Sequence, residues 1–139
     1  MRERWPEAAI EFTTAMVYCP PDECGPLLRG RAFARVRQGD HAGAASDVEE
    51  WAKKPDLSAN DMYDLACVFA LATRAANPSP LADRYGSRAV ELLRKAINAG
   101  YRDTEHMKRD KDLDSLRSRE DFRKLVAELV EKQSNRKDR

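Results

Sequence analysis

One spacing of residues, which occurs three times, constrains the fold of this chain more than any other feature. In each copy a small residue is followed four positions later by a bulky residue, and three positions after that by another apolar one. Two helices that cross closely need this arrangement, because a small residue lets the backbones approach and a bulky one fills the adjacent groove. The small residues Ala8, Ala44 and Ala89 lie 36 and 45 residues apart. The copies read Trp5-x2-Ala8-x3-Phe12-x2-Ala15-x4-Pro20, Gly39-Asp40-His41-x2-Ala44-x3-Val48-x2-Trp51 and Gly86-x2-Ala89-x3-Leu93-x2-Ala96.

The segments between the glycines and prolines all have helical periodicity. In the clearest of them, Ala89, Val90, Leu93, Ala96 and Ile97 fall on one face of a helix. No segment alternates apolar and polar residues as a half-buried strand does. We therefore predict an all-α protein.

Two further segments match the partner helix of each hairpin, and they carry a resemblance to a known family. Met62-x2-Leu65-Ala66-x2-Phe69 and Arg29-Gly30-x2-Phe33 both place an aromatic residue three positions after a small one. With the three copies above, they make the chain resemble the tetratricopeptide repeat, a helix–turn–helix unit of about 34 residues. The resemblance implies a short right-handed α-solenoid with Ala44, Ala66, Ala89 and Ala96 as close-packing positions.

The C-terminal half has a more specific likeness over residues 62–130. Its segments are Tyr63-Asp64-Leu65-Ala66-Cys67, Arg88-Ala89-Val90-Glu91-Leu92-Leu93, Gly100-Tyr101-Arg102-Asp103 and Asp110-x-Asp112-Leu113-Asp114-x-Leu116-Arg117. They are similar to the repeat region that follows the kinase domain in planctomycete-type bacterial serine/threonine kinases. The same kind of region is also found in stand-alone repeat proteins, so the likeness implies a repeat domain that is cut from, or related to, a larger bacterial signalling protein. The chain itself has no phosphate-binding glycine loop and no kinase catalytic loop, so it is expected to be kinase-associated and not an enzyme.

The register of the segment near residue 30 has two solutions. Gly30 lies two residues farther from Ala44 than the family spacing allows. Either that helix gained two residues, or the register begins at Leu28-x3-Ala32, which places Arg31 and Arg35 at positions that the family fills with apolar core residues. We favour the Gly30 register.

The expected organisation is one repeat domain over residues 1–139. Residues 5–20 would form the second helix of an incomplete repeat, whose apolar face (Ile10, Phe12, Met16) would lack its partner and could support self-association. The other expected parts are a repeat at 26–55, a repeat at 60–100 with an inserted loop at 73–84, divergent capping helices at 104–132 and a disordered tail at 133–139. An incomplete first repeat also suggests a piece of a longer protein.

The resemblance implies a function in protein–protein interaction. In this family the first helices of successive repeats line a concave groove that binds an extended or helical peptide. The residues expected to bind the partner there are Leu27, Arg31, Arg35, Asn60, Tyr63, Asp64 and Cys67. The acidic Asp64 opposes recognition of a C-terminal carboxylate, and the identity of the partner stays open.

Four arginines on one segment suggest an alternative. Arg29, Arg31, Arg35 and Arg37 could form a basic surface for an acidic or phosphorylated ligand, or for nucleic acid. They could equally be paired with acidic residues such as Asp47, Glu49 and Glu50. The net charge is only +1, which gives little electrostatic affinity for nucleic acid.

No cofactor or metal is expected. The Asp110-x-Asp112-x-Asp114 motif begins like a calcium loop, but the required glycine is absent and helix capping is the favoured role. His41 is expected to pack, His106 to be solvated, and Cys67 to be a small buried side chain rather than a reactive thiolate.

The remaining features concern the cellular compartment of the protein. No stretch of the sequence is long and apolar enough to cross a membrane, so no membrane partner is expected. Cys19 and Cys24 could close a small disulfide loop, but two reduced thiols are favoured. The cytoplasm is the expected location.

Overall fold

The computed structural model describes residues 4–20 and 23–137, with side chains through residue 134, and that part of the chain is helical and contains no strand. The predicted all-α fold is confirmed. The helices are α1 (Trp5–Val17), α2 (Gly25–Arg37), α3 (His41–Ala52), α4 (Ala59–Ala76), α5 (Pro80–Asn98), α6 (Thr104–Arg109), the 3-10 helix η2 (Lys111–Leu116) and α7 (Glu120–Lys137). None of the described helices is long and apolar enough to span a bilayer.

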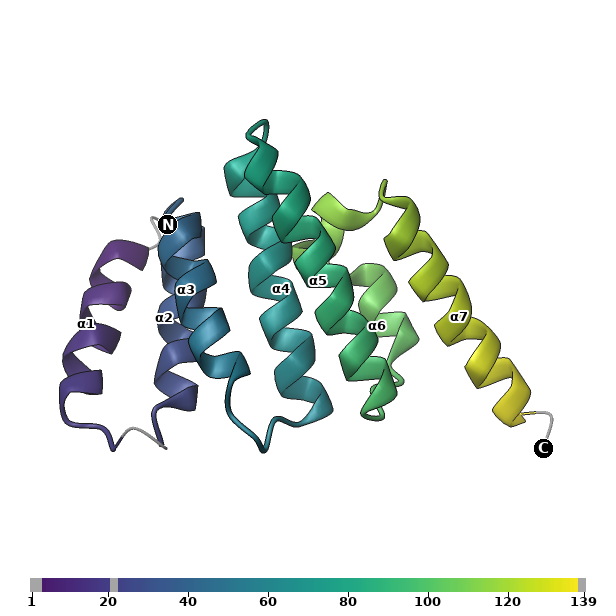
Figure 1. Cartoon of the computed structure of the whole chain (residues 1–139), viewed down its shortest axis with the longest axis horizontal. Coiled ribbons are helices and arrows are strands. Elements are labelled where there is room, and N and C mark those ends of the chain that lie inside the picture. The colour runs from purple at the N-terminus through teal and green to yellow at the C-terminus, as the bar shows by residue number, and fades with distance from the viewer. Residues whose placement is uncertain (1–3, 21–22, 138–139) are drawn as a thin grey trace.

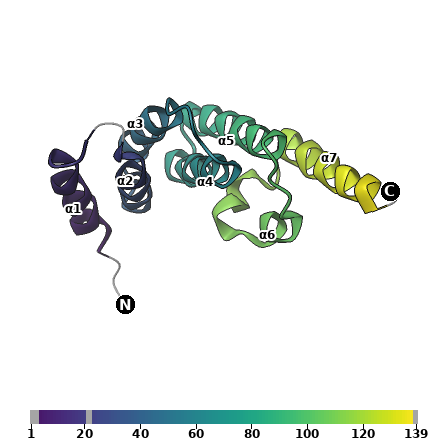
Figure 2. The ribbon, with the colours of Figure 1, turned by 90° about the horizontal axis from the view of Figure 1, so that it is seen from below.

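The helices follow one another along the longest axis of the molecule, from α1 at one end to α7 at the other (Figure 1). Seen from below, α2, α4 and α6 lie in one layer and α3, α5 and α7 in a second layer above it (Figure 2). The most extensive packing is between α4 and α5, with α2 against α3 next.

Local sequence sets the helix ends. The Asp40 carboxylate accepts a hydrogen bond from the backbone N–H of Gly43, and Ser58 and Asp61 form a reciprocal capping box at the start of α4. After α2 and α5 the chain turns at Gly39 (φ 96°) and Gly100 (φ 116°), a conformation that favours glycine.

The hydrophobic core runs between the layers and centres on α4. Seven α4 side chains from Leu65 to Ala72 are buried or nearly so, because this helix contacts both α5 and α3. The predicted close-packing alanines are all fully buried, each 0% exposed: Ala44, Ala66, Ala89 and Ala96.

The predicted loop at 73–84 is wrong. Helix α4 continues to Ala76 and α5 begins at Pro80, so only residues 77–79 connect them. The additional residues lengthen both helices of the hairpin, and Ala76, Ala82 and Tyr85 are buried in the extension. Proline at the first position of α5 needs no hydrogen-bond partner for its nitrogen, and so starts that helix rather than interrupting it.

The predicted disordered tail is also wrong for the part that the structure describes. Residues 133–137 continue α7, while 138–139 lie outside the described residues. Gln133 anchors this end, because its side-chain amide donates to the Arg102 carbonyl and its oxygen accepts from the Thr104 hydroxyl at 2.7 Å.

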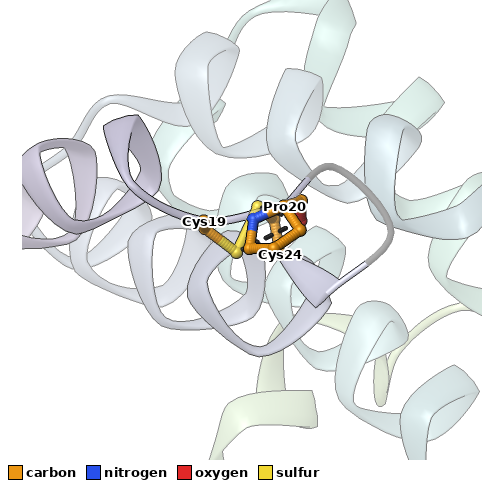
Figure 3. The surroundings of a disulfide bond; sticks show 3 residues. All are labelled: Cys19, Pro20 and Cys24. Atoms are coloured by element: carbon orange, nitrogen blue, oxygen red, sulfur yellow. Dashed lines mark hydrogen bonds between the residues drawn. A yellow bond between two sulfur atoms is a disulfide. The ribbon is translucent and has the colours of Figure 1, made fainter.

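The expectation of two reduced thiols near residue 20 is corrected as well. Cys19 and Cys24 form a disulfide across the turn between α1 and α2 (Figure 3). Their Cα atoms lie 5.8 Å apart, within the usual range for a disulfide. The connection between α1 and α2 thus brings together two side chains whose pairing the spacing alone left open.

Helix α1 packs against α2 through one face only. The Phe12 ring lies so close to Gly30 that a Cβ at that glycine would overlap it. Met16 also packs against the core, whereas Ile10 is 66% exposed. Of the three residues expected on an unpartnered face, two therefore point inward and one outward.

Candidate functional site

A groove of about 1160 Å³ lies on the layer that contains α2, α4 and α6. Helix α2 forms one wall, α4 forms the floor, and the chain from Ala99 to Asp112 forms the opposite wall. Helix α1 closes one end with two aromatic rings. The lining includes Trp5, Phe12, Arg29, Gly30, Phe33, Arg37, Asn60, Tyr63, Asp64, Cys67, Tyr101, Arg102, Asp103, His106, Asp110 and Asp112.

Four residues expected in the groove do line it. Asn60, Tyr63, Asp64 and Cys67 all come from α4, at positions three or four residues apart, which share one helix face. Asn60 is exposed, Asp64 is half-buried, and Tyr63 and Cys67 form the deeper part of the floor.

The other three, Leu27, Arg31 and Arg35, do not line the groove. Both arginines point toward α3, where they share the carboxylate of Asp47, which is only 3% exposed. Arg31 binds Asp47 through two nitrogens at 2.7 and 3.0 Å, and Arg35 approaches both oxygens at 3.1 Å.

This triad corrects the register of α2. Leu28, Ala32 and Val36 are buried, with Ala32 fully so, while Gly30 contacts α1 instead of α3. The register therefore starts at Leu28-x3-Ala32, the solution that we did not favour. Arg31 and Arg35 can occupy apolar core positions because Asp47 neutralises them at the helix–helix interface.

The remaining two arginines face the groove, and both are paired. Arg29 Nε lies 2.9 Å from Asp64 Oδ2, and Arg37 Nη2 lies 3.6 Å from Asp112 Oδ1. Each guanidinium also lies over the Phe33 ring, at 5.5 and 5.8 Å from its centroid. All four arginines thus have an acidic partner, which favours the paired interpretation over a free basic surface. Of the acidic residues expected as partners, only Asp47 has this role: Glu49 pairs with Arg88 and Glu50 with Lys53.

At the other end of the groove, Asp110 is a centre of polar contacts. Its Oδ2 accepts a hydrogen bond of 2.6 Å from the Tyr63 hydroxyl and lies 3.7 Å from the Cys67 sulfur and 3.3 Å from His106 Nε2. Its Oδ1 accepts the backbone N–H of Asp112 and so caps η2. The contacts join α4, α6 and η2 at a single carboxylate.

Two stacked tyrosines flank this carboxylate. The rings of Tyr63 and Tyr101 lie 4.6 Å apart and 8° from parallel. The Tyr101 hydroxyl is buried and has no hydrogen-bond partner among the described residues.

Burial determines the protonation state of the side chains at this end of the groove. Desolvation raises the pKa of the Tyr63, Cys67 and Tyr101 side chains, and the carboxylate of Asp110 adds to the effect for each. These hydroxyl and thiol groups are therefore protonated at neutral pH and act as hydrogen-bond donors. Desolvation, followed by repulsion from Asp110, also raises the pKa of Asp112.

The favoured capping role of the aspartate motif is confirmed for Asp110, which caps η2. Asp114 is 64% exposed and pairs with Arg117 at 2.9 Å. His41 packs as expected, with its Nδ1 3.0 Å from the Tyr85 hydroxyl. His106 is half exposed, as expected, but also contacts Asp110.

Tyr101, Asp110 and Asp112 are among the groove residues that sequence reasoning did not assign to the site. The motif Asp110-x-Asp112 was noticed only as a calcium or capping pattern. Its contact with Tyr63 spans 47 residues, a separation that helical periodicity does not reveal.

Fold and site together define an all-helical protein with a polar, partly aromatic groove on one layer. Comparison with family models finds no match, and neither the curated proteins nor the solved structures yield one.

Proposed function

We propose that the chain is a short α-solenoid of tetratricopeptide-like hairpins that acts as a non-catalytic protein-interaction module. Its ligand is a peptide segment of a partner protein, bound in the groove along α4. On the likeness described for residues 62–130, the module serves a larger bacterial signalling protein.

The observation that carries this proposal is the composition of the groove. Its lining combines aromatic rings, among them Phe12, Phe33, Tyr63 and Tyr101, with ion pairs. Peptide sites combine apolar pockets, which supply affinity, with a few placed polar groups, which fix orientation. The pair Arg29–Asp64 joins the α2 wall to the floor, and the pair Arg37–Asp112 joins the two walls. Both can exchange partners with charged groups of a peptide.

The volume of the groove also supports a peptide ligand. About 1160 Å³ exceeds what a small metabolite requires and suits several residues of an extended or helical segment. The tyrosines and the thiol in the floor are protonated donors, so they suit recognition rather than nucleophilic attack.

The test is a selection of binding peptides from a random library, followed by affinity measurement with two variants. Asn60→Arg places a long charged side chain in the groove, while Asn98→Arg makes the same change on exposed α5 in the other layer. We expect Asn60→Arg to weaken binding at least about tenfold, which equals about 1.4 kcal/mol, and Asn98→Arg to leave it unchanged. Equal affinities for both variants would place the peptide elsewhere and reject the groove.

A further inference from the structure

The deep end of the groove brings together three side chains that can bind a metal ion. The Cys67 sulfur and one oxygen each of Asp110 and Asp112 lie within 4.8 Å of one another. They come from α4, from the residue that caps η2, and from η2 itself. His106 of α6 adds an imidazole nitrogen 3.3 Å from Asp110.

Two of these distances are close to the spacing of ligands around a small tetrahedral ion. With zinc–sulfur bonds of about 2.3 Å and zinc–oxygen or zinc–nitrogen bonds of about 2.0 Å, neighbouring ligand atoms lie roughly 3.3–3.6 Å apart. The Cys67–Asp110 distance of 3.7 Å and the His106–Asp110 distance of 3.3 Å are already close to this value. The Asp112 oxygen lies up to 4.8 Å from the other two ligand atoms and the His106 nitrogen lies outside this group, so both side chains turn toward the ion on binding.

The balance of charges at this end of the groove favours a bound cation. Among the described residues, Arg37 is the arginine that pairs with one of the Asp110 and Asp112 carboxylates, at 3.6 Å from Asp112, while Arg117 donates to the backbone carbonyl of Asp110 and pairs with Asp114. Asp64 is paired with Arg29, and the Asp103 carboxylate caps α6. One negative charge in a half-buried site is therefore uncompensated by Arg37, and burial of such a charge is costly.

The unpaired Tyr101 hydroxyl is a second observation at this end of the groove. The residue is only 7% exposed, borders the groove and has no hydrogen-bond partner among the described residues. Its ring stacks on Tyr63, whose hydroxyl binds Asp110. A buried hydroxyl in this position would be satisfied by a water molecule or ligand held at the ion.

We propose that Cys67, Asp110 and Asp112 bind one zinc-class divalent metal ion, with His106 as the fourth ligand. On binding, the Cys67 S–H bond breaks, a sulfur–metal bond forms and the proton leaves to solvent. The doubly charged ion then balances the thiolate and the two carboxylates together with Arg37, so the occupied site is neutral. No electron is transferred.

The donor set selects the kind of cation. Sulfur and imidazole nitrogen favour zinc and related ions, whereas calcium and magnesium prefer oxygen ligands alone. A lysine or arginine side chain of a bound peptide would gain from the carboxylates, but it could not use the buried sulfur. This argument makes the metal site independent of the proposed peptide function.

The experiment is a cobalt titration of the full chain carrying Cys19→Ser and Cys24→Ser, which leaves Cys67 as the single thiol. We expect a sulfur-to-cobalt charge-transfer band in the near ultraviolet that saturates at one ion per chain. Zinc should abolish the band, because it binds such sites more tightly than cobalt does.

Two further variants locate the ion. In the same background, Asp112→Asn keeps the shape of the side chain and should weaken cobalt binding at least about tenfold, while Asp114→Asn, on the exposed side of η2, should not. Cys67→Ser, checked for folding by circular dichroism, should remove the charge-transfer band. Absence of the band from the parent protein, or equal affinity of the Asp112 and Asp114 variants, would overturn the metal site. Binding of a lysine-containing peptide that requires Asp112, without cobalt binding, would overturn it in favour of a cationic side chain.

Discussion

The buried carboxylate between α2 and α3 offers the sharpest test of the packing. Asp47→Asn keeps the size of the side chain but removes the charge that neutralises Arg31 and Arg35. Removing one partner of a buried ion pair costs about 3–5 kcal/mol, because the other charge stays buried without compensation. Arg31 and Arg35 are 15% and 26% exposed, so water can partly hydrate them and the lower end of that range is expected.

We therefore expect Asp47→Asn to lower the free energy of unfolding by about 3 kcal/mol, measured by urea denaturation. For a chain of this size, the melting temperature should fall by roughly 10 °C. Asp114→Asn is the matched control, because its pair with Arg117 is exposed and contributes only about 0–1 kcal/mol.

If the Leu28-x3-Ala32 register of α2 is correct, apolar replacements should restore the stability that Asp47→Asn loses. Replacing Arg31, Arg35 and Asp47 together by leucine fills apolar core positions of a helix hairpin, so this triple variant should be close to the wild type in stability. A loss below about 1 kcal/mol for Asp47→Asn would show that the triad does not hold α2 against α3. A triple variant less stable than Asp47→Asn alone would contradict the register.

Three further predictions concern other parts of the fold. Ala89→Leu forces extra volume into a fully buried crossing and should cost about 1–3 kcal/mol in denaturant unfolding. Reduction of the disulfide between Cys19 and Cys24, which are five residues apart, should cost about 2 kcal/mol by the loop-entropy relation, measured by calorimetry with and without reductant. The hydrogen bond from Arg119 lowers the pKa of Asp121, so its stabilisation is present above about pH 4 and lost as the pH falls through the folded-state value. Asp121→Asn should flatten the pH dependence of unfolding in that acidic window.

Matched controls make these outcomes decisive. Ala42→Leu makes the same alanine-to-leucine change as Ala89→Leu, but at an exposed position of α3. It should leave the free energy of unfolding within about 0.5 kcal/mol of the wild type. An equal loss for both leucine variants would contradict the assigned packing. The stability of the variant that carries both Cys19→Ser and Cys24→Ser should not change with reductant. If the stability of Asp121→Asn falls at acid pH as steeply as that of the wild type, the role of that carboxylate is rejected.

The helices and their closest contacts could be predicted from the sequence because they follow local periodicity. Ala44, Ala66, Ala89 and Ala96 share the spacing that helix crossing requires, and all four are fully buried. This part of the fold depends on residues only three or four positions apart.

The errors arose where distant side chains decide the outcome. The register of α2 depends on Asp47, whose charge lets arginines occupy core positions, and a pattern of apolar residues alone rejects that solution. The segment at 73–84 contains Asn, Ser and two prolines, which suggest a loop, yet only residues 77–79 form the turn. Pro80 starts α5, and the rest of the segment extends the two helices.

The candidate site was predictable on one side only. The α4 residues of the groove follow from the repeat-like register, and Asn60 and Asp64 were placed correctly. The opposite wall comes from residues 99–112, where short helices follow capping motifs rather than the repeat. The contact of Asp110 with Tyr63 therefore appears only in three dimensions.

The central claim, that a peptide occupies the groove along α4, is tested most directly by nuclear magnetic resonance with a selected peptide. Backbone amide shifts of the isotope-labelled chain would be followed during titration. The account predicts that the largest changes fall on α4 around Asn60 and Asp64 and on the facing segment around Tyr101. Changes confined to the other layer, in α5 and α7, would contradict it.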